Sequence, residues 1–364
     1  MARTPQEALR ATLALVAPGT ALRDGLERIL RGRTGALIVL GIDRLVESLC
    51  TGGFQIDIEF SPTRLRELAK MDGAIVLDKD VTRIHKAGVQ LVPDPSIPTA
   101  ESGTRHRTAE RVAVQTSHPV ITVSASMQII AIYVGGIRHE LEGSESILAR
   151  ATQALATLER YQQRLETVTV ALSNAEIEDT ATVRDVALVL QRLEMVRRIS
   201  EEIAQYVLEL GTDGRLVSLQ LEELAGALGP GSGVVLADYA LAAQQACCTE
   251  HPLDVDAAAN GLAELNAAEL VDLTKVARLL GFTGGPEVLE KSVQPQGVRL
   301  LAGLTNLPGA LVERVVTRFG GLQQLMAASI EDLREVEGIG DLRARTVREG
   351  LGRFAEVSLM ERYR

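Results

Sequence analysis

The sequence predicts an α/β domain at the N-terminus, followed by two all-α regions. Between residues 1 and 146, short apolar runs rich in β-branched residues alternate with amphipathic stretches of helical length. This alternation predicts a mixed sheet covered by helices. From Leu148 onward, apolar residues recur only at three- and four-residue steps, which is the period of a helix. The chain of 364 residues is therefore expected to form three domains, over residues 1–146, 147–298 and 299–364.

Within the first range, Pro18-Gly19 ends an amphipathic helix, and glycines bound the apolar run 35–41. Each later strand is a short apolar run followed by a turn signal or a helical stretch. The predicted helices cover residues 5–17, 21–31, 44–50 and 62–70. The predicted strands cover residues 35–41, 54–60, 73–77, 89–92, 120–124 and 128–133.

The middle range predicts an elongated helical domain. Two long helices are expected over 148–210, antiparallel across a turn near 174–182, with shorter alanine-rich helices in 221–248 and 257–280. Residues 151–298 carry 10 basic and 22 acidic side chains, which favours a structural spacer with solvated acidic faces. Glycines and prolines in 281–296 predict a linker into the last domain.

Composition indicates a cytoplasmic protein that does not enter a membrane. No apolar run approaches the length of a membrane span, and the first residues lack the pattern of a secretory signal. Cys50, Cys247 and Cys248 are too few and too unevenly spaced for a disulfide framework or a zinc site. The outer ranges are nearly neutral, with 18 basic and 17 acidic side chains in 1–150 and 10 and 9 in 299–364. Either end could therefore still bind a polyanion.

The most informative segment for chemistry is Arg105-His106-Arg107, which lies between Gly103-Thr104 and Thr108. Guanidinium groups pair with phosphate oxygens, and a loop loosened by glycine can turn its N–H groups toward the same anion. Because the sequence has no Gly-rich loop ending in Gly-Lys-Ser or Gly-Lys-Thr, phosphate binding is assigned to 104–108. A solvated basic turn is the alternative interpretation.

A single acid stands before a predicted strand, in Asp72-Gly73-Ala74. A turn aspartate beside a glycine is its ordinary structural role. Together with a remote cluster of cations, however, it suits nucleotidyl transfer, in which the acid serves a metal or a hydroxyl and the cations hold a triphosphate.

The last range contains two similar hairpins. The first runs from Leu304 through Pro308-Gly309-Ala310 into a helix, and the second carries Gly338-Ile339-Gly340 before a helix with three arginines, Arg343, Arg345 and Arg348. Backbone N–H groups at such a helix start can bind a phosphate without reading the bases. We expect salt-sensitive DNA binding that does not depend on sequence, weaker at the first hairpin because Ala310 replaces a glycine. A helical hairpin for protein contacts is the alternative.

Asp72-Gly73-Ala74 together with Arg105-His106-Arg107 resembles the paired signature of the diadenylate cyclase domain, and the C-terminal range resembles tandem helix-hairpin-helix units. The combination is similar to the DNA-integrity-scanning diadenylate cyclases of bacteria over essentially the whole chain. The resemblance implies condensation of two ATP into cyclic di-AMP and two pyrophosphates. It implies Mg²⁺ or Mn²⁺ at Asp72, polyphosphate at Thr104, Arg105, His106, Arg107 and Thr108, close approach of backbone at Gly73, and Leu91 beside the adenine.

Each chain has one copy of the Asp-Gly-Ala motif and one of the Arg-His-Arg motif, but the product has two equivalent phosphodiester bonds. Two domains must therefore face each other about a two-fold axis. The resemblance further implies an octamer and suppression of the cyclase by branched DNA. Two alternatives stay open: a DNA-scanning protein whose N-terminal domain senses nucleotide without turnover, and another enzyme that transfers nucleotides from ATP or hydrolyses it.

Overall fold

The computed structural model describes residues 4–226, 231–247, 253–304 and 307–361. Its internal contacts divide the chain into two compact units. The first comprises Met1–Gln153 and Glu202–Leu221, and the second comprises Ala154–Glu201 and Glu222–Arg364. The three domain ranges expected from the sequence remain a prediction.

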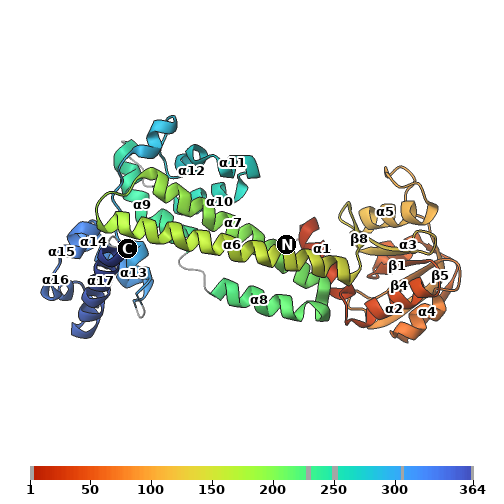
Figure 1. The fold of residues 1–364 in the computed structure, drawn as a ribbon. Coiled ribbons are helices and arrows are strands. Elements are labelled where there is room, and N and C mark those ends of the chain that lie inside the picture. The colour runs from red at the N-terminus through yellow and green to blue at the C-terminus, as the bar shows by residue number, and fades with distance from the viewer. Residues whose placement is uncertain (1–3, 227–230, 248–252, 305–306, 362–364) are drawn as a thin grey trace. The chain divides into compact units, whose positions relative to one another are not determined.

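Eight strands among the described residues form one mixed sheet in the first unit (Figure 1), in the order β2-β5-β4-β1-β6-β7-β8, with β3 also paired with β5. Only β1 and β4 run parallel, and every other pair is antiparallel. The predicted mixed sheet is thus confirmed. The strands are β1 (Ala36–Leu40), β2 (Cys50–Thr51), β3 (Phe54–Glu59), β4 (Ala74–Leu77), β5 (Arg83–Leu91), β6 (Val120–Ser124), β7 (Ile129–Val134) and β8 (Ile137–Leu141).

Three strands differ from the prediction because polar residues interrupt their apolar runs. β5 begins at Arg83 instead of residue 89, and its buried side chains alternate with exposed or half-buried ones. In β8, half-buried side chains alternate with exposed ones, and β2 has only two residues. A strand with one covered face needs only every second residue to be apolar.

Helices cover both faces of this sheet. Ile38 and Leu40 of β1 pack in one apolar cluster, and Leu37 and Val39 pack in another, as the alternation of side chains along a strand requires. The first cluster includes residues of α1 (Pro5–Val16), α2 (Ala21–Arg31) and α4 (Pro62–Leu68), and the second includes residues of α3 (Arg44–Leu49) and α5 (Thr104–Thr116).

Two long helices, α6 (Ser144–Ile177) and α7 (Val183–Leu210), follow the sheet, with the turn where the sequence predicts it. The guanidinium of Arg150 lies over the ring of Tyr206 in the first unit, and that of Arg192 lies over Tyr161 in the second. These pairs confirm that the helices are antiparallel. The remaining elements are η1 (Gly211–Gly214), α8 (Arg215–Gly226), α9 (Ser232–Cys247), α10 (Val255–Glu264), α11 (Ala267–Val271), α12 (Leu273–Leu279), η2 (Pro286–Glu290), α13 (Val298–Ala302), α14 (Gly309–Phe319), α15 (Leu322–Ala327), α16 (Ile330–Arg334) and α17 (Asp341–Glu361). None of the described helices is long and apolar enough to cross a membrane.

The segment 281–296, expected to be a linker, is instead packed into the second unit. Val288, Leu289 and Val293 are buried, and the N–H of Val293 donates to the carbonyl of Ala181. The glycines and prolines of this segment therefore mark tight turns within a folded region.

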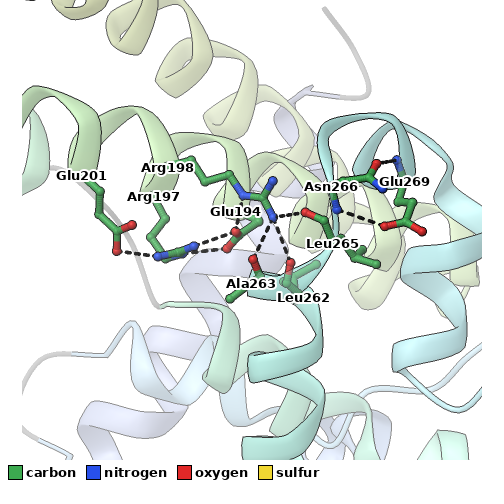
Figure 2. Close-up of polar contacts among 9 residues, drawn as sticks. All are labelled: Glu194, Arg197, Arg198, Glu201, Leu262, Ala263, Leu265, Asn266 and Glu269. Carbon is green, nitrogen blue, oxygen red and sulfur yellow. Dashed lines mark hydrogen bonds and ion pairs between the residues drawn. The ribbon is translucent and has the colours of Figure 1, made fainter. Parts of the chain in front are cut away.

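Some acids of the helical region are buried and paired, in contrast to the expectation of solvated acidic faces. Glu194 is 3 % exposed and accepts hydrogen bonds from Arg197 and Arg198 (Figure 2). Burial raises the pKa of Glu194, but the bonds from both guanidinium groups outweigh that effect and lower the pKa overall. Arg198 also donates to the carbonyls of Leu262, Ala263 and Leu265, which satisfies the C-terminal end of α10.

A second buried group joins α6 to α13 within the same unit. Arg299, 5 % exposed, forms an ion pair with Glu176, which is fully buried, and the hydroxyl of Tyr239 donates to Glu176 at 2.6 Å. Asp238, also fully buried, accepts hydrogen bonds from the N–H groups of Gly297, Val298 and Arg299. One carboxylate thereby caps the start of α13.

Candidate active site and candidate nucleic-acid interface

The strand directions bring the predicted site residues to one edge of the sheet. Because β1 and β4 are parallel, their first residues lie at the same edge, and the antiparallel strands β5 and β6 end there. Asp72-Gly73 precedes β4, Leu91 ends β5, and Ser124 ends β6. Positions far apart in the sequence therefore meet because of the sheet topology.

A cavity of about 760 Å³ opens at this edge. It contains Asp72, Gly73, Leu91, Thr104, Arg105, His106 and Thr108 of the predicted set. Arg107 is the exception, since its side chain is exposed and does not line the cavity. The cavity is also lined by Leu37, Ala74, Gly88, Val89, Gln90, Gly103, Ser124, Ser126 and Met127. The volume falls within the range of small-molecule pockets.

The Arg105-His106-Arg107 segment lies on a helix, which corrects the expectation of a loop. It forms the first turn of α5, and Gly103 is the residue that caps it. Gly103 has no side chain to bond the first N–H groups, and the helix has no acid in its first turn. Orphan N–H groups and the helix dipole make such an end a favourable place for an anion.

The guanidinium of Arg105 lies against Gly35, the residue before β1. A Cβ placed on Gly35, just before β1, would lie 2.3 Å from Nη1 of Arg105, so the guanidinium occupies the space that a side chain would fill. Gly35 is thus a residue that sequence reasoning missed, and its signal was a glycine bounding a buried strand. Thr108, one turn further along α5, donates its hydroxyl to the carbonyl of Thr104 at 2.9 Å.

His106 lies deeper than the sequence indicates. It is 7 % exposed, and its Nδ1 lies 2.8 Å from the hydroxyl of Tyr133 and 3.3 Å from that of Thr122. Burial lowers the pKa of His106, with Glu101 opposing this and Arg138 and Arg105 adding to it. A lowered pKa favours the neutral imidazole over the protonated form.

The glycine of Asp72-Gly73 is required by packing. Gly73 has a φ of +108°, and a Cβ there would lie 2.6 Å from the carbonyl carbon of Gly88 in β5. No L-side chain fits this close approach between two strands without strain. Asp72, the residue before Gly73, is exposed and lines the cavity.

No cluster of three or more His, Cys, Asp or Glu side chains suited to a metal ion occurs among the described residues. Asp72 is the carboxylate that lines the cavity. A single carboxylate still fits Mg²⁺, which is commonly bound by one or two carboxylates together with substrate phosphates and water.

The second C-terminal hairpin joins α16 to α17. Gly338 has a φ of +92°, and Ile339 is 5 % exposed within the apolar core of this region. Gly340 precedes the first turn of α17, where Asp341 is exposed. A carboxylate in that turn weakens the attraction of the helix end for a phosphate.

The three predicted DNA-contacting arginines all make contacts within the chain. Arg343 donates to the carbonyl of Gly338 at 3.0 Å, and Arg345 pairs with Asp341 at 3.0 Å. Arg348 is half-buried and donates to the carbonyl of Met326. Arg343 and Arg345 remain exposed, so both are placed to contact a phosphate as well.

The first hairpin is described only in part, because Thr305 and Asn306 lie outside the described residues. Pro308, Gly309 and Ala310 are exposed at the start of α14. Its first turn holds no acid and has no side-chain cap. On electrostatic grounds this helix end suits an anion better than that of α17, which is the reverse of the order expected from Ala310.

Two family models and several full-length relatives match this chain. A family model described as DisA bacterial checkpoint controller nucleotide-binding matches residues 23–138, and one described as DisA bacterial checkpoint controller linker region matches residues 141–289. The chain is 63 % identical to the DNA integrity scanning protein DisA of Kineococcus radiotolerans, over 99 % of each chain. It is 59 % identical to that of Streptomyces coelicolor, over 98 % of this chain and 94 % of that one.

The chain belongs to the DisA family. Every residue that lines the cavity falls within the range of the nucleotide-binding model of that family, and the two hairpins lie beyond both matched ranges. A solved structure, DacA from Staphylococcus aureus, is 21 % identical over 39 % of this chain and 92 % of that chain, with a TM-score of 0.30.

Proposed function

We propose that this chain is a diadenylate cyclase, which condenses two ATP molecules into cyclic di-AMP and releases two pyrophosphates. In this reaction each ribose 3′-oxygen attacks the α-phosphorus of the facing ATP, in line with the departing pyrophosphate. The observation that carries the proposal is that Asp72-Gly73 and the uncapped start of α5 share one cavity. Membership of the DisA family, with its nucleotide-binding domain, supports it.

The start of α5 is the proposed triphosphate site. Its unbonded N–H groups and the guanidinium of Arg105 would bind the phosphate oxygens, because a helix end and a cation act on the same anion. Thr104 is exposed beside them. Leu91, which is 7 % exposed and also lines the cavity, would contact the adenine. Arg107 is exposed and does not line the cavity of its own chain, so its proposed contact is with the polyphosphate of a facing chain.

We propose Asp72 as the residue that holds Mg²⁺ or Mn²⁺, with phosphate oxygens and water as the other ligands. Such a cation would lower the charge on the phosphates and favour ionisation of the attacking hydroxyl. The chain itself then has three tasks. It orients the two nucleotides, binds the leaving pyrophosphate with Arg105, and keeps the backbone of Gly73 close to the ribose.

Stoichiometry requires a second copy of the chain. The cavity contains one Asp72 and one Arg105, whereas the product has two equivalent bonds. We propose that two chains face each other about a two-fold axis, each contributing half of the reaction centre. An octamer, as the family resemblance implies, would contain four such pairs.

We propose that the C-terminal hairpins bind DNA through its phosphates, without sequence specificity and with a preference for branched structures. Their exposed helix starts and Arg343 and Arg345 are suited to phosphate contacts. Bound DNA would then regulate the cyclase.

The test is incubation of the purified protein with ATP and either metal, followed by mass spectrometry of the products. Asp72→Asn should abolish cyclic di-AMP while the protein still binds ATP and DNA. Asp80→Asn is the matched control, because Asp80 is an exposed acid outside the cavity. Wild-type protein that binds ATP but makes no product would support a nucleotide sensor. ADP or AMP as the main product would support hydrolysis. Full activity in Asp72→Asn would refute the proposed metal site.

A further inference from the structure

His106 is connected to a buried chain of hydrogen bonds that continues away from the cavity. Its Nδ1 lies 2.8 Å from the hydroxyl of Tyr133, which is 2 % exposed. That hydroxyl lies 2.9 Å from Oε1 of Glu101, and the same oxygen pairs with Arg138 at 2.8 Å. These hydrogen bonds thus run from the candidate active site, along the face of the sheet that α5 covers, to the ion pair of Glu101 and Arg138.

The direction of each of these hydrogen bonds follows from which of the groups carries a proton. Glu101, paired with a guanidinium, is a carboxylate and can only accept. Tyr133 has one proton, and burial raises its pKa to about 12, so the hydroxyl keeps that proton and donates it to Glu101. The Tyr133 oxygen also accepts from Arg138. In its bond with His106 this oxygen can therefore only accept, which places a hydrogen on Nδ1.

Thr122 is consistent with this assignment. Its hydroxyl lies 3.3 Å from Nδ1 of His106 and 3.5 Å from the carbonyl of Ala131, to which it donates. A hydroxyl that donates elsewhere can accept a share of the Nδ1 hydrogen. A neutral imidazole with its hydrogen on Nδ1 has a lone pair on Nε2. No side chain or carbonyl among the described residues has a hydrogen bond with Nε2, and the ring lines the cavity.

We propose that Tyr133 and Glu101 are positioning residues that fix His106 in the Nδ1–H tautomer, so that its Nε2 accepts a hydrogen bond from a ribose hydroxyl of the bound nucleotide. Phosphate oxygens at neutral pH have no hydrogen to offer to a lone pair, so His106 does not share the role of Arg105. The ribose is the nearest donor, because it is bonded directly to the phosphates that the start of α5 would hold. The identity of the donor rests on the proposed function, whereas the tautomer does not.

The tautomer is tested in the ligand-free, full-length protein by solid-state ¹⁵N NMR with labelled histidine, in which nitrogens with and without a hydrogen are well separated. The sequence has five histidines, and the His106→Gln spectrum identifies the signals of His106. We expect Nδ1 with a hydrogen and Nε2 without one. In Tyr133→Phe, which keeps the buried ring, we expect a second population with the hydrogen on Nε2. Tyr206→Phe is the control, since Tyr206 also donates to a glutamate but is half-buried on α7, outside the cavity. A wild-type Nε2 that carries a hydrogen would overturn the proposal.

The donor is tested by adding ATP or 2′,3′-dideoxy-ATP to the same sample. Only ATP should shift the Nε2 signal, because the dideoxy analogue lacks both ribose hydroxyls. An equal shift with both would assign the contact to another donor and overturn the ribose assignment. Tyr133→Phe should also reduce kcat for cyclic di-AMP about 10-fold or more with little change in KM, since a wrong tautomer leaves binding intact. An unchanged kcat would reduce Tyr133 to a structural residue. Absence of turnover in the wild type would refute the proposed function and leave the NMR result standing.

Discussion

Arg299→Met tests how strongly the buried ion pair stabilises the second unit. Arg299 donates to Glu176 through Nε and Nη2, and to the hydroxyl of Ser173 at 2.9 Å. Methionine has a similar length and no charge, so it mainly removes these bonds. The Glu176 carboxylate, fully buried, then keeps the Tyr239 hydroxyl as its hydrogen-bond donor. A buried charge without its counter-ion is the expected source of instability.

Breaking a buried ion pair by removal of one partner costs about 3–5 kcal/mol. For a unit of this size, each kcal/mol lowers the Tm by about 2–4 °C, so we expect a fall of about 10 °C. Calorimetry and circular dichroism of the full-length protein measure this fall.

Arg184→Met is the matched control, because Arg184 pairs with Glu290 on the surface, where the side chains are 44 % and 65 % exposed. An exposed pair contributes about 0–1 kcal/mol, so its loss should be hardly visible. The double variant Glu176→Met and Arg299→Met should recover most of the stability, since no uncompensated charge remains. If Arg299→Met melted at the same temperature as Arg184→Met, the attribution of stability to the buried pair would be wrong.

Three further outcomes follow from the structure. Burial raises the pKa of Asp238 from its ordinary 3.8 to about 6. Between these two pH values the carboxyl binds a proton in the folded state but not in the unfolded state. The free energy of unfolding therefore decreases as the pH rises through this window, by about 3 kcal/mol in total. The difference in unfolding free energy between wild type and Asp238→Asn, measured across that pH window, should show this slope, and a flat difference would contradict it. Gly73→Ala should lose cyclase activity and destabilise the first unit by more than the roughly 1–3 kcal/mol that a strained φ costs alone. Gly52→Ala is the control, because Gly52 has a φ of +65° with open space around it and should show only the cost of the strain. Equal melting temperatures of the two variants would contradict the close approach at Gly73. Asp341→Asn should tighten binding to a DNA junction about 2- to 5-fold in fluorescence anisotropy, because it removes a negative charge from the start of α17 and releases Arg345, and unchanged affinity would place the phosphate contacts elsewhere.

The sequence predicted the sheet well where strands are continuous apolar runs. β1, β4, β6 and β7 are buried on both faces, so their composition alone marks them. β5 was predicted too short because its first half contains Arg83, His85 and Lys86 on a partly exposed face. The pairing order was beyond the sequence, because it depends on contacts between strands far apart in the chain.

The site likewise contains residues that local sequence patterns reveal and residues that only the fold brings together. Asp72, Gly73, Arg105 and His106 were found from local composition, and the structure places them in one cavity, whereas Arg107 lies outside it. The helix that begins at Thr104 was missed because Gly103 offers no side-chain capping signal and the first turn has three consecutive polar, bulky residues. Tyr133 was missed because it lies 27 positions from His106 and meets it only in the folded domain. Glu101 was missed because its link to His106 runs through Tyr133.

The sequence contained a signal that two acids of the helical region are buried, although the acidic composition of that region suggested solvated faces. Glu176 stands four residues after Leu172, which itself continues the apolar stripe of α6 from Leu165. Glu194 likewise stands four residues after Leu190 on the apolar face of α7. Residues at such spacing share one face of a helix, so both carboxylates had to be carried into the interior with the leucines. A buried carboxylate requires a cation or hydrogen-bond donors, and Arg299 and Arg198 provide them. An acid on the apolar face of a predicted helix therefore predicts a buried ion pair, even in a segment whose net charge suggests a solvated surface.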